Sequence, residues 1–265
     1  MKYYLGKKAI TFEVAQEVVN EHNLEFSHID AINPKAKWYS RGYTTLTMPS
    51  YFIHAIKINT ENYIRKAIKK ATGNEITAID KYHHQIKDNS QHLEVLSEIG
   101  KLIHPKQLGI DVQLLIEEIK RTCAIDFNLT CNNVSDIRIF RPYHGDTMDN
   151  NPLHRDTWLP ILNNCINVYI PVFGNTQFSS LSLIPKSHLW NRNTVERTLE
   201  NAKIKNIQYG LPSVTHINRK FEVIRPNLNG NKILLFSPNI IHGGAVNLNK
   251  DLTRVSIEIR FWPKK

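Results

Sequence analysis

The sequence predicts a mainly β fold with helices, in which a helix-rich N-terminal part, residues 1–130, precedes a β-rich part, residues 131–265. Two patterns lead to this prediction. In the first part, Ile, Leu and Val recur at intervals of three and four residues, the spacing of an amphipathic helix. From about Asp136, short β-rich runs alternate with Gly, Pro and Asn, which is typical of a β-sandwich or barrel. A length of 265 residues with 41% hydrophobic content suffices for one full core, and we expect a single domain.

Three stretches of the N-terminal part have helical spacing: Phe12–His22, Glu61–Ala71 and Val112–Cys123. Thr11 is the expected N-cap of the first stretch. The second is basic and amphipathic, and it ends before the turn-forming pair Gly73-Asn74. Between Asn33 and Tyr51 the chain is aromatic and prone to turns, so we expect loops there.

Six later runs predict strands: Asp136–Arg141, Asn167–Phe173, Leu181–Ile184, Phe221–Ile224, Lys232–Phe236 and Arg254–Phe261. In the last run, apolar residues from Val255 to Phe261 alternate with Arg254, Ser256, Glu258 and Arg260, so one face is apolar and the other polar. This alternation has two interpretations. The strand lies either at a sheet edge with a solvated face, or in a small barrel whose wet interior holds a charged ligand.

Composition limits the class of protein. No stretch approaches the roughly eighteen apolar residues of a membrane-spanning helix, and the first ten residues lack an apolar signal region, so we expect a cytoplasmic location. The three cysteines, without a CxxC spacing, argue against a disulfide framework and a cysteine zinc site. The net charge is +10, and Lys186–Arg225 holds eight Lys and Arg against three Glu. This excess favours an anionic ligand or a solvated basic face, and no nucleic-acid-binding module accompanies it.

A metal site in this chain must therefore use histidine and carboxylate ligands. Two histidines and one carboxylate form the facial triad that leaves iron open positions for oxygen. On a strand, residues i and i+2 point to the same side, so His-x-Asp supplies two ligands. The pattern occurs three times, as His28-x-Asp30, His144-x-Asp146 and His154-x-Asp156. The third is the best placed, because the first lies in the helical part and the second in a loop rich in Gly, Asp and Asn.

The third ligand is predicted at His242, after the strand Lys232–Phe236 and before two glycines that let the backbone pass close to a bulky neighbour. A hydrogen-bonded histidine at a strand end would have the same local pattern. Twelve residues later, Arg254 offers a planar fork for a carboxylate, and Ser256 on the same strand face adds a hydroxyl. His83 and His84 have no partner at ligand spacing in the sequence.

The order His154-x-Asp156, His242, Arg254-x-Ser256 resembles the phytanoyl-CoA hydroxylase-like branch of the iron(II)/2-oxoglutarate dioxygenases. Residues 182–188, SLIPKSH, are similar to the family's PGSH segment, with lysine where glycine is usual, and residues 230–236 to its glycine-led strand. The resemblance covers about Asp136 to Phe261. It implies a double-stranded β-helix core, a cupin-like jelly roll, with helices packed on one side.

The resemblance also implies a reaction. Iron(II) on His154, Asp156 and His242 would chelate the 2-oxo acid end of 2-oxoglutarate, while Arg254 and Ser256 hold its distal carboxylate. With molecular oxygen, a small-molecule substrate would be hydroxylated and succinate and carbon dioxide released. Asp156 favours hydroxylation, since related halogenases have a small residue there. We expect the substrate to be an anionic or carbohydrate-linked metabolite, because of the basic excess in Lys186–Arg225.

Three further residues are candidates with simpler explanations. Asn167 falls near where relatives contact the co-substrate, although an inward polar residue would look alike. Trp158 is a candidate wall of the substrate pocket, with core packing as the alternative. Arg138 is a candidate substrate contact, with a surface salt bridge as the alternative. Two rival functions remain open: a cupin-like metal-dependent isomerase or hydrolase, which would not need Arg254-x-Ser256, and a non-catalytic anion-binding barrel.

Overall fold

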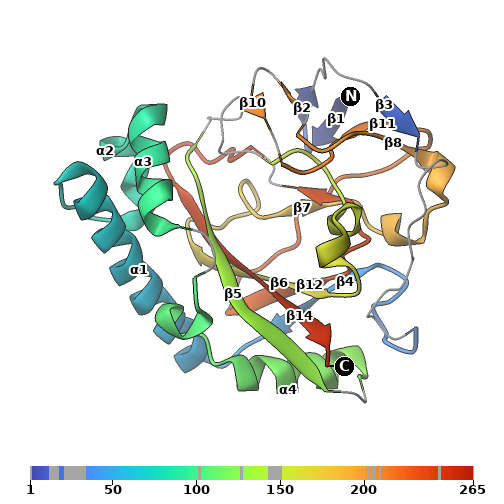
Figure 1. Cartoon of the computed structure of the whole chain (residues 1–265), viewed down its shortest axis with the longest axis horizontal. Helices are drawn as coiled ribbons and strands as arrows, with labels where there is room; N and C mark the ends of the chain where they lie inside the picture. The colour runs from blue at the N-terminus through green and yellow to red at the C-terminus, as the bar shows by residue number, and fades with distance from the viewer. Residues whose placement is uncertain are drawn as a thin grey trace.

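The computed structural model describes residues 2–11, 18–20, 34–100, 103–125, 128–142, 151–201, 203–204, 207–208, 210–243 and 246–264. Its centre is a five-stranded antiparallel sheet, in the order β4-β12-β6-β14-β5 (Figure 1). These strands are β4 (Tyr43–Thr47), β5 (Leu129–Phe140), β6 (Ile166–Phe173), β12 (Lys232–Phe236) and β14 (Arg254–Pro263). The fold is thus mixed, with helices beside a mainly antiparallel β core.

Strand β14 lies between β6 and β5, so it is not an edge strand. Its polar residues Arg254 and Ser256 are 1% and 0% exposed. The interpretation of β14 as an edge strand with a solvated face is therefore wrong, and its polar side faces the interior, as the alternative interpretation required.

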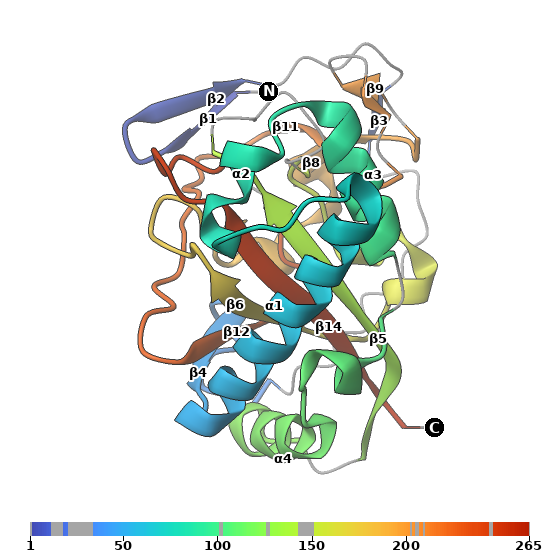
Figure 2. The ribbon, with the colours of Figure 1, turned by 90° about the vertical axis from the view of Figure 1, so that its left-hand side faces the viewer.

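Helices cover one face of the main sheet, as Figure 2 shows. They are α1 (Ser50–Thr72), η2 (Ile79–Lys81), α2 (Tyr82–Gln85), α3 (Asn89–Ile99), η3 (Pro105–Leu108) and α4 (Val112–Cys123). One apolar cluster joins Ile56 and Ile64 of α1 with Ile257 and Ile259 of β14. The N-terminal helices and the C-terminal sheet therefore share a core. No helix among the described residues has the length and apolar content needed to cross a membrane.

Short segments form a second hydrogen-bonded ladder, which faces the polar side of the main sheet. The pairing begins with β3 (Val18–Asn20), β8 (Val195–Thr198) and β11 (Val214–Ile217). The amide of Val214 donates to the carbonyl of Leu153 at 2.8 Å, and His154 pairs with His242. Strand β13 (His242–Gly243) then pairs with β7 (Ser182–Leu183), and Leu183 pairs with Ile224.

The core segments largely alternate between the two ladders along the chain. Strands β5, β6, β12 and β14 belong to the main sheet, whereas residues 153–154, β7, Ile224 and β13 belong to the second ladder. An apolar cluster with Leu234 from one ladder and Leu183 from the other fills part of the space between them. This arrangement is consistent with the predicted jelly-roll core, although the ladders do not close into a barrel.

The remaining described elements are short and lie outside the main sheet. They are β1 (Lys2–Leu5), β2 (Lys8–Thr11), η4 (Asp156–Trp158), η5 (Pro160–Leu162), η6 (Ser187–Leu189), η7 (Arg192–Thr194), β9 (Lys203–Ile204) and β10 (Ile207–Gln208).

Several predicted elements need correction. Within Phe12–His22, the described residues 18–20 form strand β3 rather than helix, because they pair with β8, and the other residues lie outside the described part. Thr11 ends β2 and is not an N-cap. Residues 43–47 form strand β4, since they pair with β12. Helix α1 begins at Ser50 rather than residue 61, and residues 221–224 contribute a single bridge. Helix α4 spans the predicted residues, and the Asp111 side chain caps it.

Candidate metal centre

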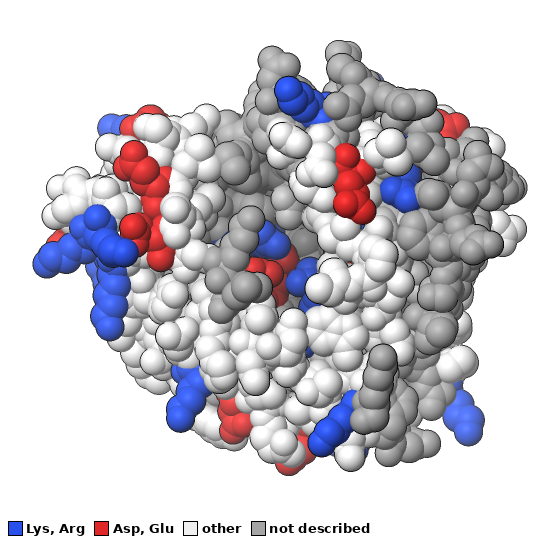
Figure 3. Space-filling view, viewed as in Figure 1, with Lys and Arg blue, Asp and Glu red and all other residues white. Residues whose placement is uncertain are grey.

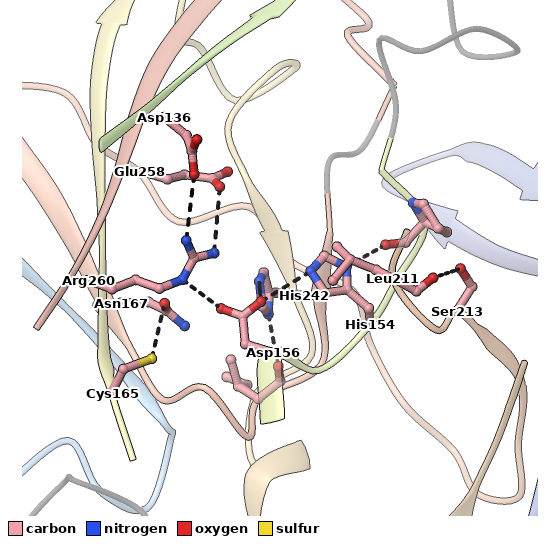
Figure 4. Close-up of polar contacts among 12 residues, drawn as sticks. Asp136, His154, Asp156, Cys165, Asn167, Leu211, Ser213, His242, Glu258 and Arg260 are labelled. Carbon is pink, nitrogen blue, oxygen red and sulfur yellow. Dashed lines mark hydrogen bonds and ion pairs between the residues drawn. The ribbon is translucent and has the colours of Figure 1, made fainter. Parts of the chain in front are cut away.

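His154, Asp156 and His242 lie together beside the polar face of β14 (Figure 4). The two histidines are backbone partners, joined by reciprocal amide-to-carbonyl hydrogen bonds of 2.9 and 2.8 Å. Asp156 is not on a regular strand, as His-x-Asp spacing had suggested; it begins helix η4, and its amide donates to the carbonyl of Pro238 at 3.0 Å. Residues 238–242, which follow β12, thus hold the backbone of the other two ligands beside His242.

A glycine allows this close approach, and a serine hydroxyl holds the backbone beside it. A Cβ atom on Gly243 would lie 2.7 Å from the carbonyl oxygen of Pro152, so the residue after His242 must be very small. The hydroxyl of Ser187 accepts a hydrogen bond from the amide of Ile241 at 2.7 Å. The close approach predicted for the two glycines is confirmed at Gly243, whereas Gly244 lies outside the described residues.

Both imidazole rings are oriented by the backbone. Nδ1 of His154 lies 2.8 Å from the carbonyl oxygen of Pro152, and Nδ1 of His242 lies 3.0 Å from that of Ile240. A carbonyl oxygen only accepts, so each Nδ1 carries the proton and each Nε2 keeps a lone pair. Those Nε2 atoms lie 3.5 and 3.8 Å from Oδ1 of Asp156. Three ligand atoms therefore converge within 4.8 Å of one another.

The two oxygens of the Asp156 carboxylate differ in their hydrogen bonding. Its Oδ2 accepts a hydrogen bond from Nε of Arg260 at 3.3 Å, whereas Oδ1 is buried and has no hydrogen-bond partner. A buried anionic oxygen without a donor is costly unless a cation binds it. Two neutral imidazoles and one carboxylate oxygen on one side of an ion make up the facial triad, which suits iron. The residues present therefore fit an iron ion.

The protonation states also suit a metal. Burial disfavours the charged form of Asp156, but the positive charge of Arg260 opposes it, and the pKa of the carboxyl lies well below its usual range. Burial lowers the pKa of His242 to about 4. At neutral pH the aspartate is thus ionised and His242 is neutral, as metal binding requires.

Arg254 and Ser256 occupy the polar face of β14 with unused hydrogen-bonding groups. One Nη of Arg254 donates to the carbonyl of Ser179 at 3.0 Å, and the guanidinium lies 3.8 Å from the ring centroid of Phe140. The Nε of Arg254 and the hydroxyl of Ser256 are buried without a partner. Burial lowers the pKa of Arg254. A buried guanidinium and a nearby hydroxyl with spare donors can bind a carboxylate.

Arg225 is a second arginine near Arg254. The sequence pattern indicated it only as the last residue of the basic stretch Lys186–Arg225. One Nη donates to the carbonyl of Val246 at 2.7 Å, while Nε and the other Nη are buried without partners. Burial, followed by the charge of Arg254, lowers the pKa of Arg225 to about 10. Two arginines therefore bring uncompensated positive charge to one corner of the site.

Asn167 and Arg138 lie on strands that flank β14. Asn167 is 2% exposed and pairs in register with Arg260; its Nδ2 has no partner, and its Oδ1 accepts a weak bond from the Cys165 thiol at 3.7 Å. Arg138 pairs in register with Ser256 and forms an ion pair with Glu258 at 3.2 Å. Both side chains therefore belong to the polar interior face, where their predicted contacts would lie.

A charge network that was not predicted extends outward from the candidate ligands. Arg260 approaches Asp136 at 3.8 Å and Glu258 at 3.9 Å, in addition to its bond with Asp156 (Figure 4). In the space-filling view, acidic and basic atoms meet in a hollow near the middle of the face (Figure 3). The alternation in β14 contained this signal, because it placed Glu258 and Arg260 on the face of Arg254.

Trp158 has the contacts of a packed core residue. It is 3% exposed and belongs to an apolar cluster with Leu153 and Ile241. The guanidinium of Arg197 lies 5.1 Å from its ring centroid. Arg197 itself is 4% exposed, whereas Lys186 and Lys220 are exposed, so the described basic residues of 186–225 do not share one environment. The competing pairs 28/30 and 144/146 lie outside the described residues.

Comparison with known proteins gives a likeness in fold. No family model and no curated protein matches the chain. The non-heme monooxygenase ThoJ, in apo form, matches with a TM-score of 0.52 at 8% identity, over 86% of this chain and 76% of that chain. The alpha-ketoglutarate-dependent carbocyclase SnoK from nogalamycin biosynthesis has a TM-score of 0.49 at 16% identity, over 92% and 85%.

EctD from S. alaskensis, with 2-oxoglutarate and 5-hydroxyectoine, has a TM-score of 0.48 at 11% identity, over 95% of this chain and 86% of that chain. Since two of the three scores fall below 0.5, the shared fold is inferred from ThoJ. The predicted membership of the phytanoyl-CoA hydroxylase-like family is not confirmed by these matches and stays a prediction.

Proposed function

We propose that the chain, as one domain of residues 1–265, is a non-haem iron(II) and 2-oxoglutarate-dependent dioxygenase of the phytanoyl-CoA hydroxylase-like type. The observation that carries the proposal is the unpartnered Oδ1 of Asp156, which is buried and faced by the lone pairs of two oriented imidazoles. His154, Asp156 and His242 would hold the iron. Arg254 and Ser256, with Asn167 as a further contact, would hold 2-oxoglutarate.

Bound iron(II) would supply the oxidation of a C–H bond, in which one 2-oxoglutarate and one O2 yield succinate, carbon dioxide and one hydroxyl on the substrate. The chain's own residues would bind the co-substrate, orient the metal ligands and exclude water. The buried guanidinium of Arg254 neutralises the distal carboxylate, and the ring of Phe236, 4.7 Å from that of His242, shields one side of the centre. Arg260 holds Oδ2 of Asp156 and leaves one oxygen for the ion.

The substrate would enter from the polar hollow, where Arg138 keeps a third of its side chain exposed, at 34%. A small charged or polyhydroxylated metabolite fits such a surface, because paired arginines and carboxylates offer both donors and acceptors. We propose an anionic or carbohydrate-linked substrate, with Arg138 as its contact. Trp158, which packs with Leu153 and Ile241, would support the wall of the pocket from behind.

The test is succinate formation from 2-oxoglutarate by full-length protein supplied with iron(II), ascorbate and air. Wild type is expected to release succinate, and His154→Ala to release none, while its matched control His216→Ala, an exposed strand histidine, keeps the wild-type rate. Iron-independent binding of 2-oxoglutarate without succinate would favour the anion-binding barrel. Absence of both binding and succinate would favour the isomerase or hydrolase and overturn the proposal.

A further inference from the structure

A second cluster of possible metal ligands lies on the helix side of the molecule. His83 and His84 belong to the four-residue helix α2, and Asp251 lies in the segment that leads into β14. Nε2 of His83 lies 3.0 Å from Oδ1 of Asp251, and Nε2 of His84 contacts the same oxygen. One ligand atom from each residue lies within 4.8 Å of the others, although more than 160 residues separate the two histidines from Asp251 in sequence. This convergence is absent from the sequence pattern.

The geometry is close to what a tetrahedral ion requires. With zinc bonds of about 2.0–2.1 Å, neighbouring ligand atoms in a tetrahedron lie about 3.3 Å apart. The two imidazoles of His83 and His84 are nearly perpendicular, at 76°, so their lone pairs can approach one point from different directions. A small outward rotation of His84 and Asp251, which are 55% and 52% exposed, would admit an ion. Water would complete the coordination.

His83 is held in place by a partner behind the ring. Its Nδ1 lies 2.8 Å from the hydroxyl of Thr253, and its side chain is 13% exposed. Such a hydrogen bond to the far nitrogen is the usual support of a metal-ligating histidine. Burial lowers the pKa of His83, and the hydrogen bond from Lys81 is the largest cause that lowers the pKa of Asp251. Neutral imidazole and ionised carboxylate are the forms that bind a metal.

Lys81 is the competing cation in this cluster. Its ammonium group binds Oδ2 and the backbone carbonyl of Asp251, whereas both histidines face Oδ1. The lysine therefore occupies the other carboxylate oxygen and leaves the histidine-facing position available. It also fixes the carboxylate in the orientation that presents Oδ1 to the two rings.

We propose that His83, His84 and Asp251 form a second metal site, distinct from the triad, for a divalent transition-metal ion of the zinc type. Imidazole nitrogens select such ions over magnesium and calcium, which prefer all-oxygen sites. The ion links α2 to the segment just before Arg254, where the amide of Thr253 already donates to the carbonyl of Asp80 at 2.8 Å. Its binding braces the start of β14 and with it the guanidinium proposed for the co-substrate.

The experiment is a calorimetric zinc titration of the full chain and its variants. Wild type is expected to bind two equivalents, His84→Ala one, and the control His216→Ala two. His154→Ala is expected to lose the other equivalent and to keep the one that depends on His84. Because the two sites are removed by different substitutions, failure of the second site and failure of the proposed function give different results.

A thermal measurement supports the titration. In His154→Ala, zinc at about a hundredfold excess over its dissociation constant is expected to raise the Tm by about 5 °C, and in the double variant with His84→Ala not at all. Asp251→Ala should behave as His84→Ala does, and a folded His84→Ala is expected because its ring is 55% exposed. The proposal would be overturned if neither His84→Ala nor Asp251→Ala changed the zinc stoichiometry and the zinc-induced rise in Tm.

Discussion

Arg260 provides the sharpest test of how the candidate ligands are held, through the substitution Arg260→Met. Its Nε donates to Oδ2 of Asp156 at 3.3 Å, and Asp156 is 1% exposed. Methionine keeps most of the apolar stem and removes the charge, so a buried carboxylate is left without its cation. Removing one partner of a buried pair costs about 3–5 kcal/mol. The long bond and the 17% exposure of the Arg260 side chain favour a smaller loss, of about 2–3 kcal/mol.

The assay is thermal unfolding with and without a divalent metal. For a chain of this size, each kcal/mol corresponds to about 2–4 °C, so the metal-free variant should melt about 5–10 °C below wild type. A bound ion neutralises Asp156 from the Oδ1 side, and the difference should then shrink by half or more. An equal loss with and without metal would refute the reasoning, because Arg260 would then contribute packing rather than charge.

Three further predictions concern the same residues. In metal-free protein, the difference in unfolding free energy between wild type and Arg260→Met should narrow as the pH falls below about 4. The depressed pKa of Asp156 stabilises the folded state only while the carboxyl is ionised in the unfolded state. Urea unfolding from pH 6 to 2 measures this difference, and a difference that stays constant would contradict the prediction. Gly243→Ala should lower the Tm and weaken metal binding, because the added Cβ would lie 2.7 Å from the carbonyl oxygen of Pro152. The expected loss of unfolding free energy is about 1–3 kcal/mol. An unchanged Tm by scanning calorimetry would contradict this prediction. Arg254→Gln should weaken 2-oxoglutarate binding about 30-fold or more with little change in iron binding, as loss of a charge-assisted contact costs about 2–5 kcal/mol; a parallel loss of iron would argue against its assignment to the co-substrate.

Local patterns predicted those elements whose own residues determine their structure. Helix α4 carries its capping Asp111 and its apolar spacing within the chain segment, and β14 shows its two faces in strict alternation. By contrast, β3 and β4 are strands because distant partners, β8 and β12, complete their hydrogen bonds. Such pairing is set by tertiary structure, and no spacing within residues 18–20 or 43–47 encodes the partner.

The candidate site divides in the same way. Spacing and the resemblance selected His154, Asp156 and His242, and the structure brings these three together among the described residues. The role of Arg260 toward Asp156 could not be read from spacing, since it depends on the register of β14 against β6 and on where helix η4 begins. The cluster of His83, His84 and Asp251 depends likewise on the docking of α2 beside the segment before β14.

The central claim is that Asp156, rather than the Asp146 of the competing His-x-Asp pair, completes the iron site with His154 and His242. Anaerobic addition of iron(II) and 2-oxoglutarate should give a weak visible charge-transfer band in wild type and in Asp146→Ala, and no band in Asp156→Ala. A band that persists in Asp156→Ala and disappears in Asp146→Ala would contradict the account.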